Sequence, residues 1–241
     1  MALTKWNQKL TPLDNELQQL KQEIISMGHL VLTQLQKAQE ALEDMDRDLA
    51  REVILTEKRV NAFELKIDRD CENILALFAP VAIDLRFVLA MLKINTNLER
   101  TGDIAEGIAK FIVDTKDGFD SALLELTRTT EMYLQANEMV LDVMNALERE
   151  DTLLARKVFK KDDLLDEINK NAASLAGKYI KENPEKTESA LYILSVIRKL
   201  ERVGDQAKNM AEEIIFYSEA MILKHEKKSR KKNEGEKEDG N

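Results

Sequence analysis

The chain has 241 residues, of which 44% are hydrophobic and 34% are charged, with only 8 glycines, 3 prolines and 5% aromatic residues. This composition is typical of long α-helices, so we expect an all-α protein. The net charge of −9 argues against binding to nucleic acid or to an anionic membrane surface, and it favours a cationic ligand or a basic partner.

The cysteine content and the length of the apolar runs indicate where in the cell the protein works. The single cysteine, Cys71, cannot form an intramolecular disulfide, and the first residues lack the charged and apolar regions of a secretory signal. Apolar runs such as Phe87 to Leu92 are far shorter than the roughly 20 residues of a membrane-spanning helix. We therefore expect a cytoplasmic protein without direct membrane insertion.

Proline and glycine divide the chain into predicted helices. Thr11 followed by Pro12 and Asp14 is a typical helix start, with an N-cap, a proline and an acidic first turn. The clearest break lies around Gly118, in the segment "DTKDGFDS". The predicted helices cover approximately residues 12–43, 48–77, 84–115, 121–147, 152–181 and 188–223.

Two sequence motifs recur in the same order. "LERTGD" at Leu98 returns as "LERVGD" at Leu200, 102 residues later, and "LAREV" at Leu49 returns as "LARKV" at Leu154, 105 residues later. Self-similarity of this kind indicates duplication of a three-helix unit. We therefore predict two tandem antiparallel three-helix bundles, at residues 12–116 and 119–223.

The charged segment at residues 224–241 loses all apolar periodicity, so we expect it to be disordered. Its first part is basic and offers a contact for an acidic partner or lipid. A solvated tail is the simpler interpretation of such a charge run.

Paired carboxylates follow the buried face of the third and sixth predicted helices. With about 100° per residue, Glu99 and Asp103 fall beside the apolar seam, as do Glu201 and Asp205. Like charges four residues apart and a glycine in mid-helix both disfavour the helix, by about 2 to 3 kcal/mol over the two copies. We expect Gly102 and Gly204 to allow another helix to approach closely.

The neighbouring helix in each half supplies two further polar side chains, Glu57 with Asn61 and Asp162 with Asp166. Two interpretations stay open. The carboxylates form an ordinary solvated face, or they bind a cation, which relieves their repulsion. Because no histidine or cysteine joins the set, the cation would be one that prefers oxygen, namely Mg²⁺, Mn²⁺, Ca²⁺ or iron.

Arginine follows the glutamate in both copies of the motif. Arg100 and Arg202 are placed to anchor a partner or a phosphate, but we expect them to form intrahelical ion pairs with Asp103 and Asp205.

The duplicated "LER-x-GD" motif, the "LAR-x-V" motif and "APVAIDLR" in the first half resemble the PhoU family of bacterial phosphate-transport regulatory proteins. The resemblance extends from about residue 13 to residue 216. It implies two three-helix bundles whose second and third helices bind metal ions. It also implies a protein without enzymatic activity, frequently a homodimer, that contacts the Pst phosphate ABC transporter and a sensor histidine kinase. Such proteins are negative regulators that help to repress the phosphate-starvation response when phosphate is plentiful.

The resemblance also identifies the expected metal ligands. They are Glu57, Asn61, Glu99 and Asp103 in the first half, and Asp162, Asp166, Glu201 and Asp205 in the second. The first set departs from the family pattern, because Asn61 is neutral and Gly107 stands where the second half has Asn209. We therefore expect the first half to bind cations less tightly, or to bind fewer of them.

Other functions are weighed against this one. A ferritin-like storage or oxidase bundle needs Glu-x-x-His on two helices, and neither His29 nor His225 lies near the carboxylates. A helical adaptor that binds no metal remains an alternative, and metal content distinguishes it. A nucleic-acid role lacks both a recognition motif and the required positive charge.

Overall fold

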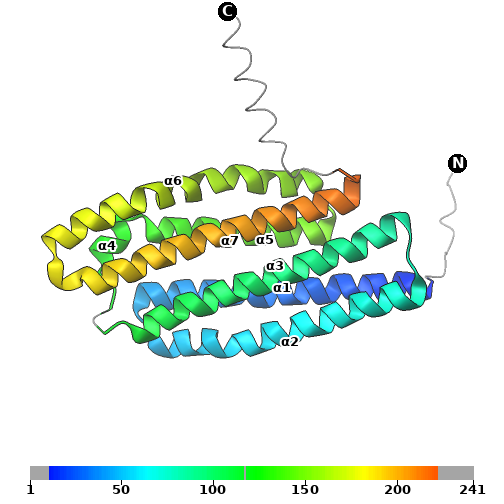
Figure 1. Ribbon diagram of the computed structural model, residues 1–241, viewed down its shortest axis with the longest axis horizontal. Coiled ribbons are helices and arrows are strands. Elements are labelled where there is room, and N and C mark those ends of the chain that lie inside the picture. Colours follow the sequence, from blue (N-terminus) through cyan, green and yellow to red (C-terminus); the bar gives the residue numbers. More distant parts are fainter. Residues whose placement is uncertain (1–10, 117, 222–241) are drawn as a thin grey trace, which may run out of the picture.

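The computed structural model describes residues 11–116 and 118–221, which fold into long antiparallel helices without any β-strand (Figure 1). Three long helices form the first bundle: α1 (Pro12–Asp44), α2 (Arg47–Phe78) and α3 (Ala82–Asp114). The predicted all-α fold of two tandem three-helix bundles is confirmed. The tail at residues 224–241, predicted to be disordered, lies outside the described residues.

The second bundle repeats this arrangement with one additional break. Its three long helices are α5 (Thr129–Arg149), α6 (Thr152–Glu182) and α7 (Thr187–Glu219). A short helix, α4 (Ser121–Leu126), precedes α5, and a single 3₁₀ turn, η1 (Pro184–Lys186), precedes α7.

Side-chain hydrogen bonds cap the starts of α1, α2 and α6, and the cap of α1 is the one that the sequence predicts. The Thr11 hydroxyl accepts a hydrogen bond from the Asp14 amide at 3.1 Å, and the Asp14 carboxylate accepts one from the Thr11 amide at 2.8 Å. This reciprocal capping box satisfies two backbone donors at the start of α1. The two repeats share a second cap, because Asp46 and Asp151 each accept hydrogen bonds from two amides in the first turns of α2 and α6.

The single helix predicted for residues 121–147 is wrong, because the chain breaks between α4 and α5. Arg128 adopts a left-handed conformation with φ of 55°, and the Thr127 hydroxyl donates to the Leu123 carbonyl at 2.7 Å. The Thr127 and Thr129 hydroxyls also pair at 2.7 Å. Threonine side chains compete in this way with the helical hydrogen bonds, which explains the break.

The two bundles pack side by side along their length and share one core (Figure 1). Helix α3 packs on α7, and α1 packs on α5. Along the first of these junctions, Lys93 of α3 forms an ion pair with Glu213 of α7 at 3.0 Å. Within residues 11–116 and 118–221, every helix lacks the long apolar stretch that a membrane crossing requires.

Candidate cation site

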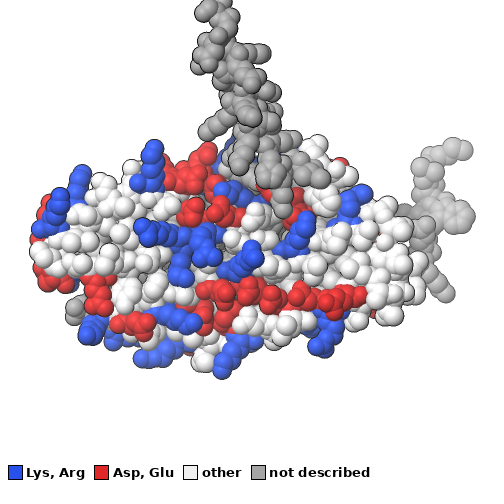
Figure 2. All heavy atoms as spheres, viewed as in Figure 1, with Lys and Arg blue, Asp and Glu red and all other residues white. Residues whose placement is uncertain are grey.

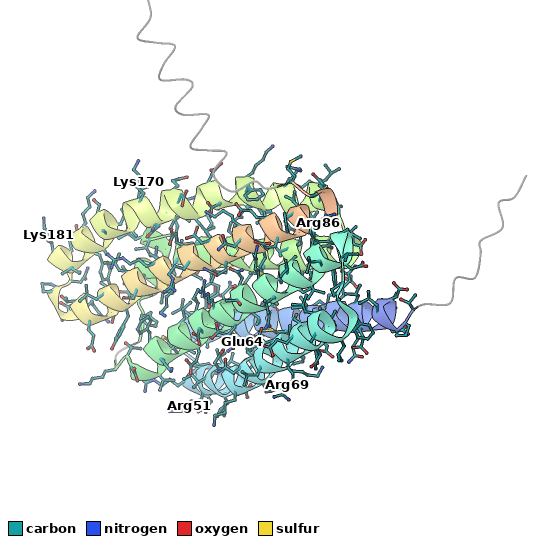
Figure 3. All side chains as sticks on the ribbon, turned by 45° about the vertical axis from the view of Figure 1, so that its right-hand side comes forward. Arg51, Glu64, Arg69, Arg86, Lys170 and Lys181 are labelled. Carbon is teal, nitrogen blue, oxygen red and sulfur yellow. The ribbon has the colours of Figure 1, made fainter. Side chains whose placement is uncertain are left out.

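Acidic side chains of α2 and α3 gather along the junction of these two helices. We call the following six residues the first acidic stripe: Glu57, Glu64, Asp68, Glu99, Asp103 and Glu106. Figure 2 shows acidic side chains in a band between α2 and α3, beside a group of basic side chains over α7. In Figure 3, Glu64 lies at the α2–α3 junction, whereas Arg51 and Arg69 lie on the outer side of α2.

Glu57 is the buried member of the stripe, with 4% of its surface exposed. Its Oε2 accepts a hydrogen bond of 2.9 Å from the Gln34 side-chain amide, and its Oε1 is buried without any hydrogen-bond partner. The Gln34 carbonyl Oε1 is likewise buried and unpartnered. Two oxygen acceptors therefore remain unsatisfied at this place, and a buried acceptor without a donor is unfavourable.

Gln34 belongs to α1, and sequence reasoning missed it. No motif marks this glutamine, and its only signal is a polar side chain at a buried position of an apolar helix face. Gln34 also donates to the Val53 carbonyl at 3.2 Å, so its amide is fixed against α2.

The electrostatics of the stripe favour a positive charge. Burial, followed by repulsion from Asp103, Glu106 and Glu99, raises the pKa of Glu57 to about 7, although the hydrogen bond from Gln34 opposes this. Burial and the neighbouring Asp103 and Glu64 raise the pKa of Glu99 as well. A cation placed among these carboxylates would favour their ionised forms.

The stripe continues along α2 beyond the predicted residues. Asn95 of α3 donates to Asp68 Oδ1 at 2.8 Å and to the Glu64 carbonyl at 3.0 Å, which connects the two helices. Burial and the nearby Asp68 and Asp103 raise the pKa of Glu64.

The second half has a shorter group, which we call the second acidic cluster: Asp162, Asp166, Glu201 and Asp205. Asp162 is buried, with 4% exposed, and its Oδ2 accepts a hydrogen bond from the ammonium of Lys208. The same ammonium pairs with Asp205 at 2.8 Å. Burial lowers the pKa of Lys208, but its bonds to Asp162 and Asp205 outweigh burial and hold it above the ordinary value.

The carboxylates of the second cluster still repel one another. Burial raises the pKa of Asp162, Lys208 opposes this, and Asp166 and Asp205 add to it. For Glu201, burial followed by repulsion from Asp205 and Asp166 raises the pKa. The structure thus brings the predicted carboxylates of each half within electrostatic reach of one another.

Two predicted ligands lie at the edge of these groups. Asn61 and Asp166 are exposed, and neither forms a hydrogen bond or ion pair with another described side chain. The ion pairs expected for Arg100 and Arg202 are also absent from the described residues, because Asp205 pairs with Lys208 and both arginines are exposed. That expectation is therefore wrong.

Within the part of the chain that the structure describes, no three His, Cys, Asp or Glu side chains converge closely enough to enclose a metal ion. The first acidic stripe nevertheless fits an oxygen-coordinated cation, because Glu57 Oε1 and Gln34 Oε1 are buried acceptors without donors. In the second cluster a lysine ammonium already contacts two of the carboxylates.

The chain is similar in sequence to known proteins of one family. Residues 24–112 and 129–214 each match the PhoU domain. The Aquifex aeolicus protein named phosphate-specific transport system accessory protein PhoU homolog is 36% identical over 214 residues, which cover 89% of this chain and 96% of that relative. The PhoU accessory protein of Escherichia coli K12 is 30% identical over 210 residues, which cover 87% of this chain and 86% of that relative.

Solved structures show the same similarity. The crystal structure of PhoU from Pseudomonas aeruginosa has a TM-score of 0.82 and 32% identity, and the match covers 86% of this chain and 99% of that one. The phosphate transport system regulatory protein PhoU from Streptococcus pneumoniae has a TM-score of 0.76 and 27% identity, over 88% of this chain and 99% of that one.

Proposed function

Because this chain belongs to the PhoU family, we propose that it is a non-enzymatic accessory regulator of phosphate transport. The relatives named above are accessory proteins of phosphate-specific transport systems, which supports this role. In the proposed function the protein works in the cytoplasm as a homodimer. It contacts the Pst phosphate transporter and a sensor histidine kinase, and it represses the phosphate-starvation response when phosphate is plentiful.

The first acidic stripe is proposed to bind a cation with oxygen ligands. Glu57, Glu99 and Asp103 would hold it, with Asn61 at the exposed edge. The single observation that carries this proposal is the buried Oε1 of Glu57, which has no hydrogen-bond donor. Mg²⁺, Mn²⁺, Ca²⁺ and iron suit this set of carboxylate and amide oxygens.

When bound, the cation would supply positive charge between α2 and α3. These two helices already pack extensively against each other, so a shared ion would fix their spacing. It would also reduce the negative charge on the face that is available to a partner. The protein's own residues would do the rest: Gln34 would orient the Glu57 carboxylate, and Gly102 would leave room for it.

A reporter experiment tests the regulatory part. Phosphate-replete cells that lack the chain should express a phosphate-starvation reporter, and the wild-type chain should silence it again. A Glu99→Gln/Asp103→Asn variant should fail to restore silence, because it removes two carboxylates from the proposed cation site. A matched Glu16→Gln/Glu40→Gln variant removes two exposed carboxylates of α1 and should restore silence. If the deletion leaves the reporter silent, the regulatory role is wrong for this chain.

An adaptor that binds no metal is the second candidate function. The exposed Asp103 and the half-buried Glu99 and Glu106 would then serve directly as a docking surface for a basic partner. Transporter binding in the presence of a chelator distinguishes the two. Unchanged binding favours the adaptor, whereas loss that is reversed by added Mn²⁺ favours the cation-dependent regulator.

A further inference from the structure

The two halves of the molecule differ at one position, three residues after the repeated motif, and this difference changes the local charge. Lys208 of α7 lies three residues after Asp205, and its ammonium contacts both Asp162 and Asp205. The equivalent residue of the first half, 102 positions earlier, is Glu106 of α3. One repeat therefore places an ammonium where the other places a carboxylate.

Among the described residues, no lysine or arginine forms the corresponding ion pairs in the first half, although Lys199 of α7 lies within electrostatic reach of Asp103 and Glu106. Among residues 11–116 and 118–221, Glu57, Glu99 and Asp103 form no ion pair with lysine or arginine. Glu106 does pair with Lys110, at 2.6 Å, but this is a contact between successive turns of α3. Arg100 acts electrostatically on Glu99, but none of the three proposed ligands has a lysine or arginine of the described residues at ion-pair distance.

The orientation of the two buried carboxylates gives a second, independent difference. In each half one oxygen lies against a glycine of the next helix: a Cβ built on Gly102 is 2.9 Å from Glu57 Oε2, and one built on Gly204 is 3.1 Å from Asp162 Oδ1. In the first half this inner oxygen accepts from Gln34, and the other oxygen is free.

In the second half the pattern is reversed. The outer oxygen of Asp162 accepts from Lys208, and the inner oxygen has no partner. The residue equivalent to Gln34, 105 positions later, is Met139, whose methyl group lies 3.6 Å from the Cβ position of Gly204 and cannot donate. The oxygen that is available to a cation in the first half is therefore occupied by an ammonium in the second.

We propose that Lys208 is a built-in counter-ion that takes the place of a metal ion in the second half, so that cation binding is confined to the first half. The inference rests on the proposed cation site of the first acidic stripe. A lysine ammonium supplies one positive charge and up to three hydrogen bonds to the surrounding carboxylates. A divalent ion entering the second cluster would have to displace it or lie beside it against charge repulsion.

This inference reverses the expectation from the sequence that the first half binds cations less tightly. The neutral Asn61 is exposed and lies at the edge of the site, whereas Lys208 occupies its centre in the other half. The difference in cation binding between the halves therefore depends on Glu106 of α3 and Lys208 of α7, each about one turn after the carboxylate pair.

The test counts Mn²⁺ ions bound per chain, by equilibrium dialysis of the full-length protein followed by metal analysis. Compared with the wild type, the Asp103→Asn variant should lose the bound Mn²⁺, whereas the matched Asp205→Asn variant should keep it. Lys208→Glu copies the first half and should about double the Mn²⁺ bound per chain, because a second set of oxygen ligands becomes free. Glu106→Lys copies the second half and should abolish binding.

The gain in Lys208→Glu is the decisive result, because a misfolded variant would lose metal rather than acquire it. If the wild type binds Mn²⁺ but Lys208→Glu acquires none, or if Asp205→Asn loses as much as Asp103→Asn, this inference is wrong while cation binding itself stands. If Lys208→Glu binds Mn²⁺ and the wild type does not, Lys208 does exclude metal but the proposed first site fails. Absence of Mn²⁺ from all four variants and the wild type overturns both.

Discussion

Gly102 lies directly against the carboxylate of Glu57, because a methyl group on Gly102 would approach Glu57 Oε2 to 2.9 Å and Val60 Cγ1 to 3.1 Å. In the second repeat, Gly204 has the same relationship to Asp162, because its Cβ position lies 3.1 Å from Asp162 Oδ1 and 2.6 Å from Leu165 Cδ2. Both glycines lie within helices, at a local cost of about 1 kcal/mol each relative to alanine. The close approach of α2 to α3 and of α6 to α7 explains the presence of glycine at a position where it weakens the helix.

Alanine substitutions test this explanation. Gly102→Ala should lower the free energy of unfolding by about 1 to 2 kcal/mol, because overpacking outweighs the gain in helix propensity. Gly204→Ala should lower it at least as much, since its nearest neighbour is the buried Leu165. Urea unfolding monitored by circular dichroism measures both changes.

Gly177 provides the matched control within α6. A Cβ on this glycine would meet nothing within 4 Å, so Gly177→Ala should raise the free energy of unfolding by up to about 1 kcal/mol. If Gly102→Ala stabilises the protein as much as Gly177→Ala, the first glycine is not needed for helix contact.

Removal of bound cation should destabilise the protein through the first acidic stripe. At a cation concentration about 100 times the dissociation constant, binding contributes about 2.7 kcal/mol to the free energy of unfolding. For a chain of this size, that corresponds to a melting temperature about 5 to 10 °C higher with Mn²⁺ than with a chelator. Glu57→Gln should abolish this difference, because it replaces the buried carboxylate by a neutral amide of the same shape. An equally large Mn²⁺ effect in Glu57→Gln would place the cation elsewhere.

The sequence predicted the helices and their pairing because these depend on local signals. Apolar spacing defined the buried seam of α3, and Thr11, Pro12 and Gly118 marked the places where helices begin or the chain breaks. The duplicated motif then predicted two similar bundles, which the structure confirms. The break at Arg128 was missed, since no proline or glycine marks it and the threonine hydroxyls that cause it act through the backbone.

The composition of the candidate site was harder to predict, because it depends on contacts between helices. Glu57 and Glu99 were found from their spacing along α2 and α3, but Gln34 reaches the site from α1, and nothing in its local sequence shows which residue it will meet. Lys208 was overlooked for a related reason. The sequence suggested a partner for Asp205 at Arg202, whereas the third residue after the aspartate faces Asp162 across the α6–α7 contact.

Cys71 should be unreactive in the folded protein. Its side chain is 1% exposed, and burial, with smaller contributions from Asp68 and Asp70, raises the pKa of its thiol to about 12. A thiol of ordinary pKa, near 8.5, reacts much faster at pH 9 than at pH 7. We expect labelling by a thiol-reactive dye to stay slow at both values and to become fast when guanidinium unfolds the chain. Rapid labelling of the native protein at pH 9 would contradict this burial.

The contact between the start of α4 and helix α6 should make a pH-dependent contribution to stability. The Tyr179 hydroxyl donates to Asp120 Oδ2 at 2.7 Å, and Asp120 also caps α4 through the Ala122 amide. The hydrogen bond from Tyr179, followed by the one from Ala122, lowers the pKa of Asp120. A carboxyl group whose pKa is lower in the folded state stabilises the protein above its unfolded pKa, near 3.9, and this contribution is lost as the pH falls through the folded pKa.

Tyr179→Phe should therefore lower the free energy of unfolding by about 1 kcal/mol at pH 7. This value is small for a hydrogen bond to a charged group, because Asp120 is only half-buried. The difference from the wild type should shrink as the pH falls below about 4, where the carboxyl group becomes protonated. Urea unfolding at pH 7, 5 and 3.5 measures it. Tyr192→Phe is the control, because the Tyr192 ring packs on Phe111 and its hydroxyl makes no hydrogen bond within the described residues, so its effect should not change with pH. A Tyr179→Phe effect that is the same at pH 3.5 and pH 7 would show that the tyrosine contributes through packing rather than through the charged hydrogen bond.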